Sequence, residues 1–188
     1  RIGFSTAFQK YVLDNPEEHC VCIMMDLDDF KFINDLYGHD VGDAALVSLA
    51  SDIRKNFHHG SISARTGGDE FLVVLKNTDK VTAEKLVSDF ASMPHSFVWD
   101  GKTYSYGVSV GYADYPANAK NQAELIGKAD IALYEAKLHG KRSYRGYNES
   151  FNIDSNNRKR LGFALSDVSD NLPGAFLIYK ADPNDDRI

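Results

Sequence analysis

The sequence predicts an α+β fold, with a mainly antiparallel central sheet, flanking helices and a ferredoxin-like βαββαβ core. Segments with apolar residues at helical spacing alternate with short runs rich in β-branched and aromatic residues. Two pairs of these β-rich runs are joined by short turns that contain glycine, which is typical of antiparallel hairpins. The 188 residues are 43% hydrophobic and 26% charged, which suits a globular chain with one well-buried core.

The first part of the chain is predicted to contain two helices, a buried strand and a hairpin. Apolar residues at helical spacing indicate the helices, and a continuous apolar run indicates the strand between them. The segment from that strand to the second helix is expected to be a loop. The hairpin turn contains Gly67 and Gly68, and glycine permits a positive φ. The expected elements are a helix ending before residue 15, a strand at 19–25, a helix at 41–57 and strands at 61–66 and 71–75.

The second part is predicted to add two helices, a further hairpin and a closing strand. The hairpin turns at Asp100 and Gly101, and Gly140 ends the last helix. Beyond residue 147 the composition becomes polar, which predicts a linker at 148–165 and a fragment of another domain at 166–188. The expected elements are a helix at 81–93, a hairpin at 95–112, a helix at 122–138 and a strand at 143–147.

Charge and hydropathy exclude several classes of partner. The formal net charge is −6, so the chain lacks the positive field with which proteins bind a nucleic-acid polymer. No run approaches the roughly 18 apolar residues of a membrane span, so we expect no membrane contact by this segment. Cys20 and Cys22 alternate along the first strand and are expected to be buried, reduced thiols. We therefore expect a cytoplasmic domain, within a parent protein that can carry a membrane anchor elsewhere.

Two acidic segments are candidates for a metal site. Asp26, Leu27 and Asp28 end the first strand, whereas Asp69 and Glu70 lie in the first hairpin turn. If those strands pair, their carboxylates converge, and Mg²⁺ is usually held by one or two carboxylates together with phosphates and water. Strand ends and turns also attract Asp and Gly because they are solvated, and for either segment alone that interpretation is favoured.

The residues that follow the first strand suggest nucleotide binding. Lys31 can neutralise terminal phosphates. Asn34 and Asp43 offer an amide and a carboxylate, which together match the two donors on the edge of guanine. Taken singly, Asn34 is more often a turn or cap residue, and Asp43 is more often an anion in the first turn of a helix.

Three collinear stretches closely resemble the signature segments of the GGDEF family. They are 25–46 (MDLDDFKFINDLYGHDVGDAAL), 65–71 (RTGGDEF) and 129–141 (ADIALYEAKLHGK), and 106–113 (YGVSVGYA) is similar to the strand before the family's last helix. The resemblance covers about residues 1–147. It implies a nucleotidyl-cyclase-like core and a diguanylate cyclase, which condenses two GTP molecules into cyclic di-GMP in bacterial second-messenger signalling.

The resemblance also implies the catalytic groups. Asp26 and Asp69 would bind Mg²⁺ (or Mn²⁺) through their carboxylates, together with the backbone carbonyl of Leu27. Glu70 would help to hold a second metal ion or assist deprotonation of the ribose hydroxyl, and its role is left open between the two.

The substrate-binding groups follow from the same matches. Asn34 and Asp43 would recognise guanine, and Lys31 and Lys137 would contact the terminal phosphates, with Lys141 as a further binding residue. The backbone of Asp29 and Phe30 would enclose the triphosphate, and Gly67 and Gly68 would leave space beside the ribose.

The family mechanism needs two domains, each holding one GTP, so the expected partners are GTP and a second GGDEF domain in a homodimer, with release of pyrophosphate. The alternative is a catalytically silent GTP-binding module that regulates a larger signalling protein, for which loss of an acid or of a guanine contact would be expected. A third interpretation, hybrid dinucleotide synthesis, would be expected to replace Asp43 with a small residue.

Two further segments are compared with known patterns. Where many family members carry an Arg-x-x-Asp product-inhibition site, this chain has His58 and Ser61 at the two key positions, so product binding there is expected to be weak or absent. Residues 166–188 resemble the opening of a PAS sensory domain, with an ordinary strand after a longer linker as the alternative.

Overall fold

The computed structural model describes residues 2–15, 18–57 and 61–151. These residues fall within one compact unit, Arg1–Asn152. Most of the predicted linker at 148–165 and all of the fragment at 166–188 lie outside the described residues, so both remain predictions. Along the chain the elements are α1 Ile2–Asp14, β1 Cys20–Leu27, α2 Phe30–Tyr37, α3 His39–Asn56, β2 Ile62–Gly67, β3 Glu70–Lys76, α4 Lys80–Ser92, β4 His95–Trp99, β5 Lys102–Tyr106, β6 Val108–Tyr115, α5 Gln122–Leu138 and β7 Tyr144–Gly146.

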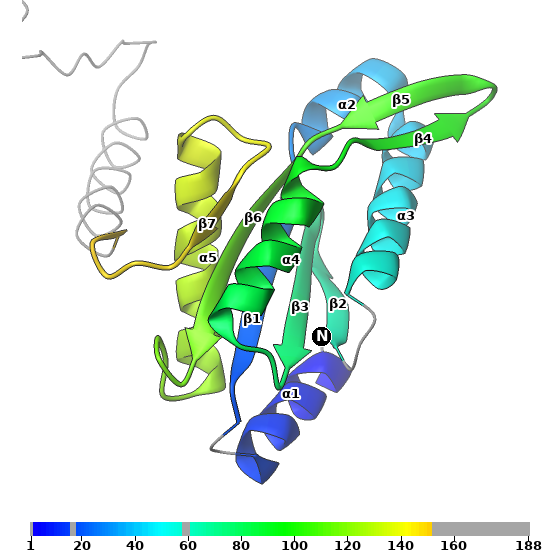
Figure 1. Ribbon diagram of the computed structural model, residues 1–188. Coiled ribbons are helices and arrows are strands. Elements are labelled where there is room, and N and C mark those ends of the chain that lie inside the picture. The colour runs from blue at the N-terminus through cyan, green and yellow to red at the C-terminus, as the bar shows by residue number, and fades with distance from the viewer. Residues whose placement is uncertain (1, 16–17, 58–60, 152–188) are drawn as a thin grey trace, which may run out of the picture. The chain divides into compact units, whose positions relative to one another are not determined.

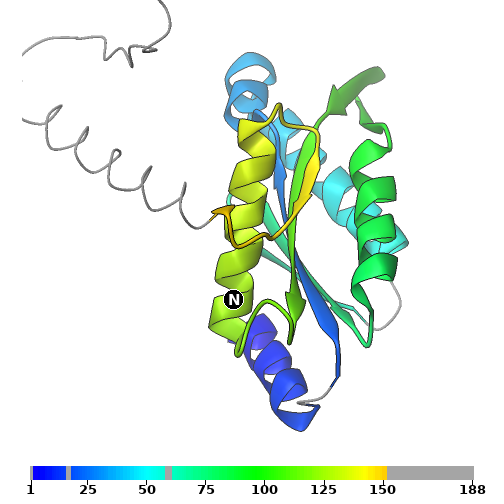
Figure 2. The ribbon, with the colours of Figure 1, turned by 60° about the vertical axis from the view of Figure 1, so that its left-hand side comes forward.

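A five-stranded sheet forms the centre of the domain, in the order β2-β3-β1-β6-β7. All of its neighbouring strands are antiparallel except β6 and β7, which are parallel. Helices α1 and α5 cover one face of the sheet and α3 and α4 cover the other (Figures 1 and 2). The predicted α+β class and its mainly antiparallel sheet are therefore confirmed.

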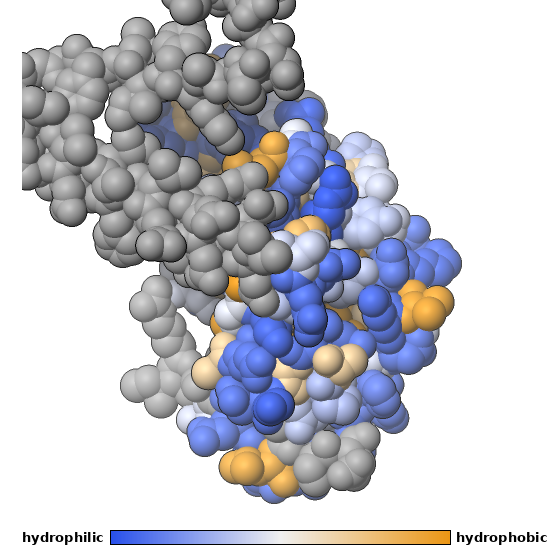
Figure 3. Space-filling model, turned by 90° about the vertical axis from the view of Figure 1, so that its left-hand side faces the viewer, coloured by the Kyte–Doolittle hydropathy of each residue, from blue (hydrophilic) through white to orange (hydrophobic). Residues whose placement is uncertain are grey.

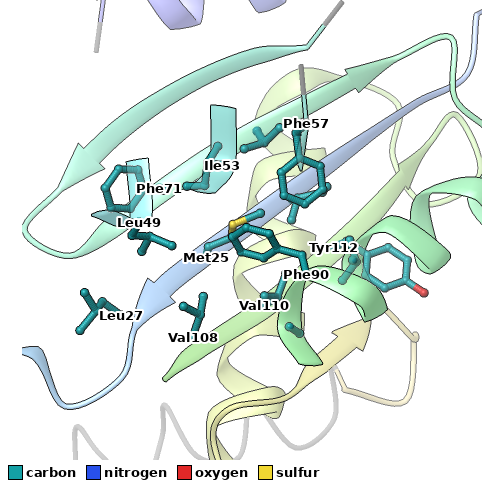
Figure 4. Close-up of a cluster of buried hydrophobic side chains, with 14 of the residues drawn as sticks. Met25, Leu27, Leu49, Ile53, Phe57, Phe71, Phe90, Val108, Val110 and Tyr112 are labelled. Carbon is teal, nitrogen blue, oxygen red and sulfur yellow. The ribbon is translucent and has the colours of Figure 1, made fainter. Parts of the chain in front are cut away.

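The central strand β1 contributes to both hydrophobic layers. All eight of its residues are buried, and their side chains alternate between the two faces. Val21, Ile23 and Met25 pack with α3 and α4, where Figure 4 shows side chains from β1, β3, α3 and α4 meeting in one cluster. Cys20 and Cys22 point to the other layer, against α1 and α5, and both are free buried thiols as predicted.

Helix α2 was expected to be a loop, and that expectation is wrong. It has eight residues, none of them fully buried, and Phe30 and Ile33 are its only apolar side chains that pack against the core cluster on the α3 side. Its apolar residues do recur at helical spacing, but over only eight residues between a strand and a longer helix, and so short a run is not assigned by periodicity alone. Its position directly after β1 places the residues after the first acidic segment on a helix.

The second hairpin also differs from the prediction. The strands β4 and β5 form a separate two-stranded sheet, with positive φ at Asp100 and Gly101 as the turn requires. The strand β6 instead enters the central sheet between β1 and β7. In the first hairpin, neither Gly67 nor Gly68 has a positive φ, so the turn does not use the freedom that these glycines permit.

The outer surface gives no sign of a membrane-crossing element among the described residues, where no helix is both long enough and apolar enough. The visible described part of the face over α5 is mostly hydrophilic (Figure 3).

Close contact between β6 and α5 depends on Gly111. A Cβ atom there would lie 2.0 Å from the backbone nitrogen of Leu133 and 2.4 Å from the carbonyl oxygen of Ala129. We predict that Gly111→Ala lowers the free energy of unfolding by about 2 kcal/mol or more, because the helix backbone must shift. Gly127, in the same helix, has open space around it, so Gly127→Ala should raise stability by roughly 0.5–1 kcal/mol. Urea unfolding of both variants is the measurement, and equal stability of the two would contradict the close contact.

Candidate active site

The two acidic segments meet at one end of the sheet. Asp26 lies directly opposite Glu70 in the antiparallel register of β1 and β3, so their side chains emerge on the same face. The backbone nitrogen of Leu27 lies 3.4 Å from the carbonyl oxygen of Asp69, to which it donates. The convergence that the sequence predicts for these segments is present in the structure.

Asp26 is a buried acid at the end of a buried strand. It follows Cys22 and Met24 on the face of β1 that α5 covers, and it is 6% exposed. Lys137, in the last turn of α5, places its Nζ atom 2.7 Å from Asp26 Oδ2. Burial raises the pKa of Asp26 from 3.8 to about 6; Lys137 opposes that rise, and the charges of Asp69 and Asp28 add to it.

Asp28 is buried, and its carboxylate stabilises the structure around the site. It is 5% exposed; its Oδ1 accepts a hydrogen bond from Ser109 Oγ at 2.6 Å, and its Oδ2 accepts one from the backbone N–H of Arg142 at 2.9 Å. These bonds tie the end of β1 to β6 and to the segment after α5. The sequence placed Asp28 in an acidic segment but gave no sign of these partners, which are more than 80 residues away along the chain.

Asp29 and Lys141 form a second link between the same two segments. Asp29 has φ 58° just before α2 begins, and its Oδ1 lies 2.5 Å from Lys141 Nζ. Lys141 has positive φ as well, at 55°. Together with the pair Lys137–Asp26, this arrangement directs both lysines at the end of α5 toward the acids at the end of β1.

Asn34 presents an unpartnered acceptor beside α3. Its Oδ1 atom is buried and has no hydrogen-bond partner among the described residues. A Cβ atom at Gly42 would lie 1.9 Å from that oxygen, so the glycine provides the room that the Asn34 amide occupies. The requirement for Gly42 was missed in the sequence, although a glycine inside the predicted helix at 41–57 was a signal of close packing.

Asp43 is exposed on α3 and lines a cleft of about 500 Å³ between that helix and the strands β2 and β3. Arg65, which the sequence analysis did not single out, lines the same cleft and donates from Nε to the carbonyl oxygen of Gly68 at 2.8 Å. That bond holds the shape of the turn before Asp69.

The remaining predicted residues surround these groups. Phe30 begins α2 and is half-buried, while Lys31 is exposed on the next position of the helix. Gly67 ends β2. A Cβ atom at Gly68 would meet nothing within 4 Å, so the surface beside the acids is open at that point. At the product-inhibition position, Ser61 donates a hydrogen bond to the carbonyl oxygen of Phe57, whereas His58 lies outside the described residues, and weak product binding stays a prediction.

The donors at the end of β1 suit a hard divalent cation that is completed by its substrate. No group of three or more His, Cys, Asp or Glu side chains within the described ranges is arranged to hold a metal ion alone. Mg²⁺ usually takes only one or two carboxylates from the protein, with phosphates and water filling the other positions. Asp26 and Asp69, together with the backbone carbonyl of Leu27, would supply that smaller donor set.

The raised pKa of Asp26 leads to a stability prediction. Because the folded pKa lies above the unfolded one, the ionised carboxylate destabilises the fold above about pH 6, and this cost shrinks as the pH falls from 6 toward 3.8. Asp26→Asn should therefore raise the free energy of unfolding at pH 7.5, on the order of 1–3 kcal/mol, and by less at pH 4.5. Urea unfolding of the metal-free protein at both pH values measures the difference, with Asp89→Asn on the exposed face of α4 as a control. A loss of stability at pH 7.5, or a gain that does not depend on pH, would show that burial does not dominate at Asp26.

The chain resembles known proteins over most of its described length. The family model described as "Diguanylate cyclase, GGDEF domain" matches residues 1–143. The bifunctional diguanylate cyclase/cyclic di-GMP phosphodiesterase MucR of Pseudomonas aeruginosa is 33% identical over 159 residues, which are 82% of this chain and 22% of MucR. The first curated relatives are thus much longer than the region matched here, which spans about a fifth to a third of their length.

Solved structures agree with the fold. The isolated GGDEF domain of TpbB (YfiN) from Pseudomonas aeruginosa has a TM-score of 0.78 at 31% identity, covering 83% of this chain and 94% of that one. The active GGEEF domain of a diguanylate cyclase from Vibrio cholerae has a TM-score of 0.71 at 28% identity, covering 79% of this chain and 97% of that one. With the family match over residues 1–143 and the acidic turn at the end of the sheet, this chain belongs to the GGDEF family of diguanylate cyclase domains.

Proposed function

We propose that this domain is an active diguanylate cyclase that condenses two molecules of GTP into cyclic di-GMP and releases pyrophosphate. The observation that carries the proposal is the convergence of Asp26, Asp69 and Glu70 at one end of the sheet. The sequence retains the acids Asp26, Asp69 and Glu70, and several of the relatives that match it are named diguanylate cyclases. For the silent GTP-binding alternative we would expect the loss of an acid or of a guanine contact, and the sequence retains Asp26, Asp69, Glu70, Asn34 and Asp43.

Guanine would be recognised between α2 and α3. The buried Oδ1 of Asn34 has no partner within the described residues and is ready to accept a hydrogen bond. Asp43 supplies a second acceptor from the next helix. Guanine presents two adjacent donors, N1–H and N2–H, whereas adenine has no matching pair, so these acceptors favour GTP over ATP.

The triphosphate would lie across the start of α2 and the end of α5. Backbone N–H groups at Asp29 and Phe30 begin an eight-residue helix, and helix N-termini favour anions. Lys31 on α2 and Lys137 and Lys141 at the end of α5 bring three positive charges to the same region. Ammonium groups on long flexible side chains can follow the phosphates as they bind.

Asp26, Asp69 and the backbone carbonyl of Leu27 would hold Mg²⁺ or Mn²⁺, with Glu70 beside them. When bound, such an ion neutralises phosphate charge and lowers the pKa of the attacking ribose hydroxyl. Glu70 faces Asp26 across the strand pair and is half-exposed. It is placed either to share a second ion or to accept the proton of that hydroxyl.

One domain holds half of the reaction, so we propose a homodimer in which two sites face each other. The 3′-hydroxyl of each GTP attacks the α-phosphorus of the other, so that a new P–O bond forms as the bond to pyrophosphate breaks. The hydroxyl proton passes to Glu70 or to water. The domain's task is to hold both nucleotides in line, which removes most of the entropic barrier to their meeting.

The test is incubation of the chain with GTP and Mg²⁺ at several protein concentrations, with products separated by chromatography and identified by mass. We expect cyclic di-GMP at a rate that rises faster than linearly with protein concentration. GTP binding without any product would instead support the regulatory module, and a linear rate would reject an association of domains that changes over the concentrations tested.

The acids of the turn can be tested separately from the fold. We predict that Asp69→Ala and Glu70→Ala each abolish synthesis, because they remove a metal ligand or a proton acceptor, while the free energy of unfolding changes by no more than about 1 kcal/mol. Asp89→Ala removes an acid from the exposed ion pair with Lys85 on α4 and should keep full synthesis. Wild-type turnover in either turn variant would refute the assignment of that residue.

A further inference from the structure

The ammonium group of Lys137 is bound to the same carboxylate that we assign to the metal. Its Nζ atom lies 2.7 Å from Asp26 Oδ2, and the two side chains are 34% and 9% exposed. Lys137 lies in the last turn of α5, and Asp26 lies in the β1 strand that this helix packs against. Lys137, which we propose binds phosphate, is thus paired with Asp26, which we propose binds the metal ion.

We propose that Lys137 is a stand-in cation: its ammonium group pairs with the Asp26 carboxylate in the nucleotide-free domain, in the place of a metal ion. This pairing keeps metal binding weak until a triphosphate draws the lysine away. The inference rests on the proposed function, because it assigns Asp26 to the metal and Lys137 to the phosphates. It makes Lys137 a positioning residue that couples metal binding to nucleotide binding.

Charge crowding at the end of β1 explains why a stand-in is needed. Asp26 is buried near Asp69 and Asp28, and both of these acids add to the negative potential at its carboxylate. A buried carboxylate without a cation is costly, so a positive group stabilises the domain before any metal arrives. Lys137 supplies that group from the covering helix.

The same contact works against a metal ion. Mg²⁺ binds a carboxylate oxygen at a distance of about 2.0–2.1 Å. With an ammonium group already bound to that carboxylate, the two positive charges would lie within a few ångströms in a partly buried site, where water screens them poorly. Metal binding to Asp26 therefore requires the ammonium group to leave.

Lys137 can leave the Asp26 carboxylate, because its side chain can move and a phosphate group offers another partner. Its side chain is one-third exposed, and its four-carbon stem lets the charged end move while the helix backbone stays in place. Lys141, which lies just beyond the end of α5, is paired in the same way with Asp29. Each lysine is paired with an acid that a phosphate group can replace, so binding of the triphosphate frees both carboxylates.

An alternative is that Lys137 only stabilises the fold or only raises the affinity for nucleotide. The two interpretations differ in the sign of one effect. If Lys137 competes with the metal, removing its charge tightens metal binding in the absence of nucleotide; if it only supports the site, removal leaves metal binding unchanged or weaker.

The experiment measures Mn²⁺ binding by calorimetry and by electron paramagnetic resonance at pH 8, without nucleotide. We expect Lys137→Met to bind Mn²⁺ on the order of tenfold more tightly than the wild type, since a nearby positive charge has been removed. Lys137→Gln provides a second neutral variant in case the first fails to fold. Lys137→Arg keeps the charge and should resemble the wild type.

Lys85→Met is the matched control, because it removes the same charge from an exposed lysine on α4; its Mn²⁺ affinity should stay within twofold of the wild type. With a non-hydrolysable GTP analogue, Lys137→Met should bind the nucleotide several-fold more weakly, so that the two effects have opposite signs. Unchanged or weaker Mn²⁺ binding in the neutral variants overturns the proposal. So does undetectable Mn²⁺ binding in every variant, because the lysine is then not what limits it.

The synthesis assay on the wild-type chain keeps the two proposals distinguishable. Tighter Mn²⁺ binding in Lys137→Met together with no cyclic di-GMP from the wild type would support the exchange of Lys137 for a metal ion at Asp26. The same result would reject the proposed cyclase activity. Cyclic di-GMP synthesis together with unchanged Mn²⁺ affinity would retain the cyclase and reject the exchange.

Discussion

The burial of β1 on both faces is the constraint on which the rest of the structure depends. β3 and β6 pair with it on either side, and its side chains pack into both hydrophobic layers. A strand with no exposed face can present polar groups only where it ends. The first acid, Asp26, stands at that end, and the partner strands fix what lies beside it: Glu70 on β3 and Ser109 on β6. The site is thus positioned by the most rigid part of the domain.

This position has an energetic consequence. Burial raises the pKa of Asp26 to about 6, which means that the ionised acid disfavours the folded state. The domain offsets the cost with cations from the end of α5 rather than by removing acids. Active sites commonly sacrifice stability for chemistry, and the arrangement at Asp26 fits the metal site that we propose. A structural acid would show the pattern of Asp28, whose two oxygens both accept hydrogen bonds from fixed donors.

The sequence predicted the parts of the fold that have long, regular apolar patterns, such as β1, the hairpin of β2 and β3, and α5. It did not predict α2, because the helical spacing of its apolar residues extends over only eight residues between a strand and a longer helix. The separation of β6 from the hairpin of β4 and β5 also depends on tertiary pairing. In the site, the neighbourhood of Asp26 and Glu70 followed from strand pairing, whereas the partners of Asp28 and the space that Gly42 leaves for Asn34 depend on contacts that only the folded chain defines.

The two halves of the proposed nucleotide site are prepared in different ways. On the base side, Asn34 holds an oxygen that is buried and unpartnered, in a space kept open by Gly42, so the acceptor is preorganised for a donor. On the phosphate side, two of the three lysines are already paired, Lys137 with Asp26 and Lys141 with Asp29. A preorganised acceptor favours selectivity, since a base without the matching donor leaves it unpaired. Paired charges favour exchange, since a phosphate and a metal ion arriving together replace two ion pairs with two others and leave no buried charge alone at any step.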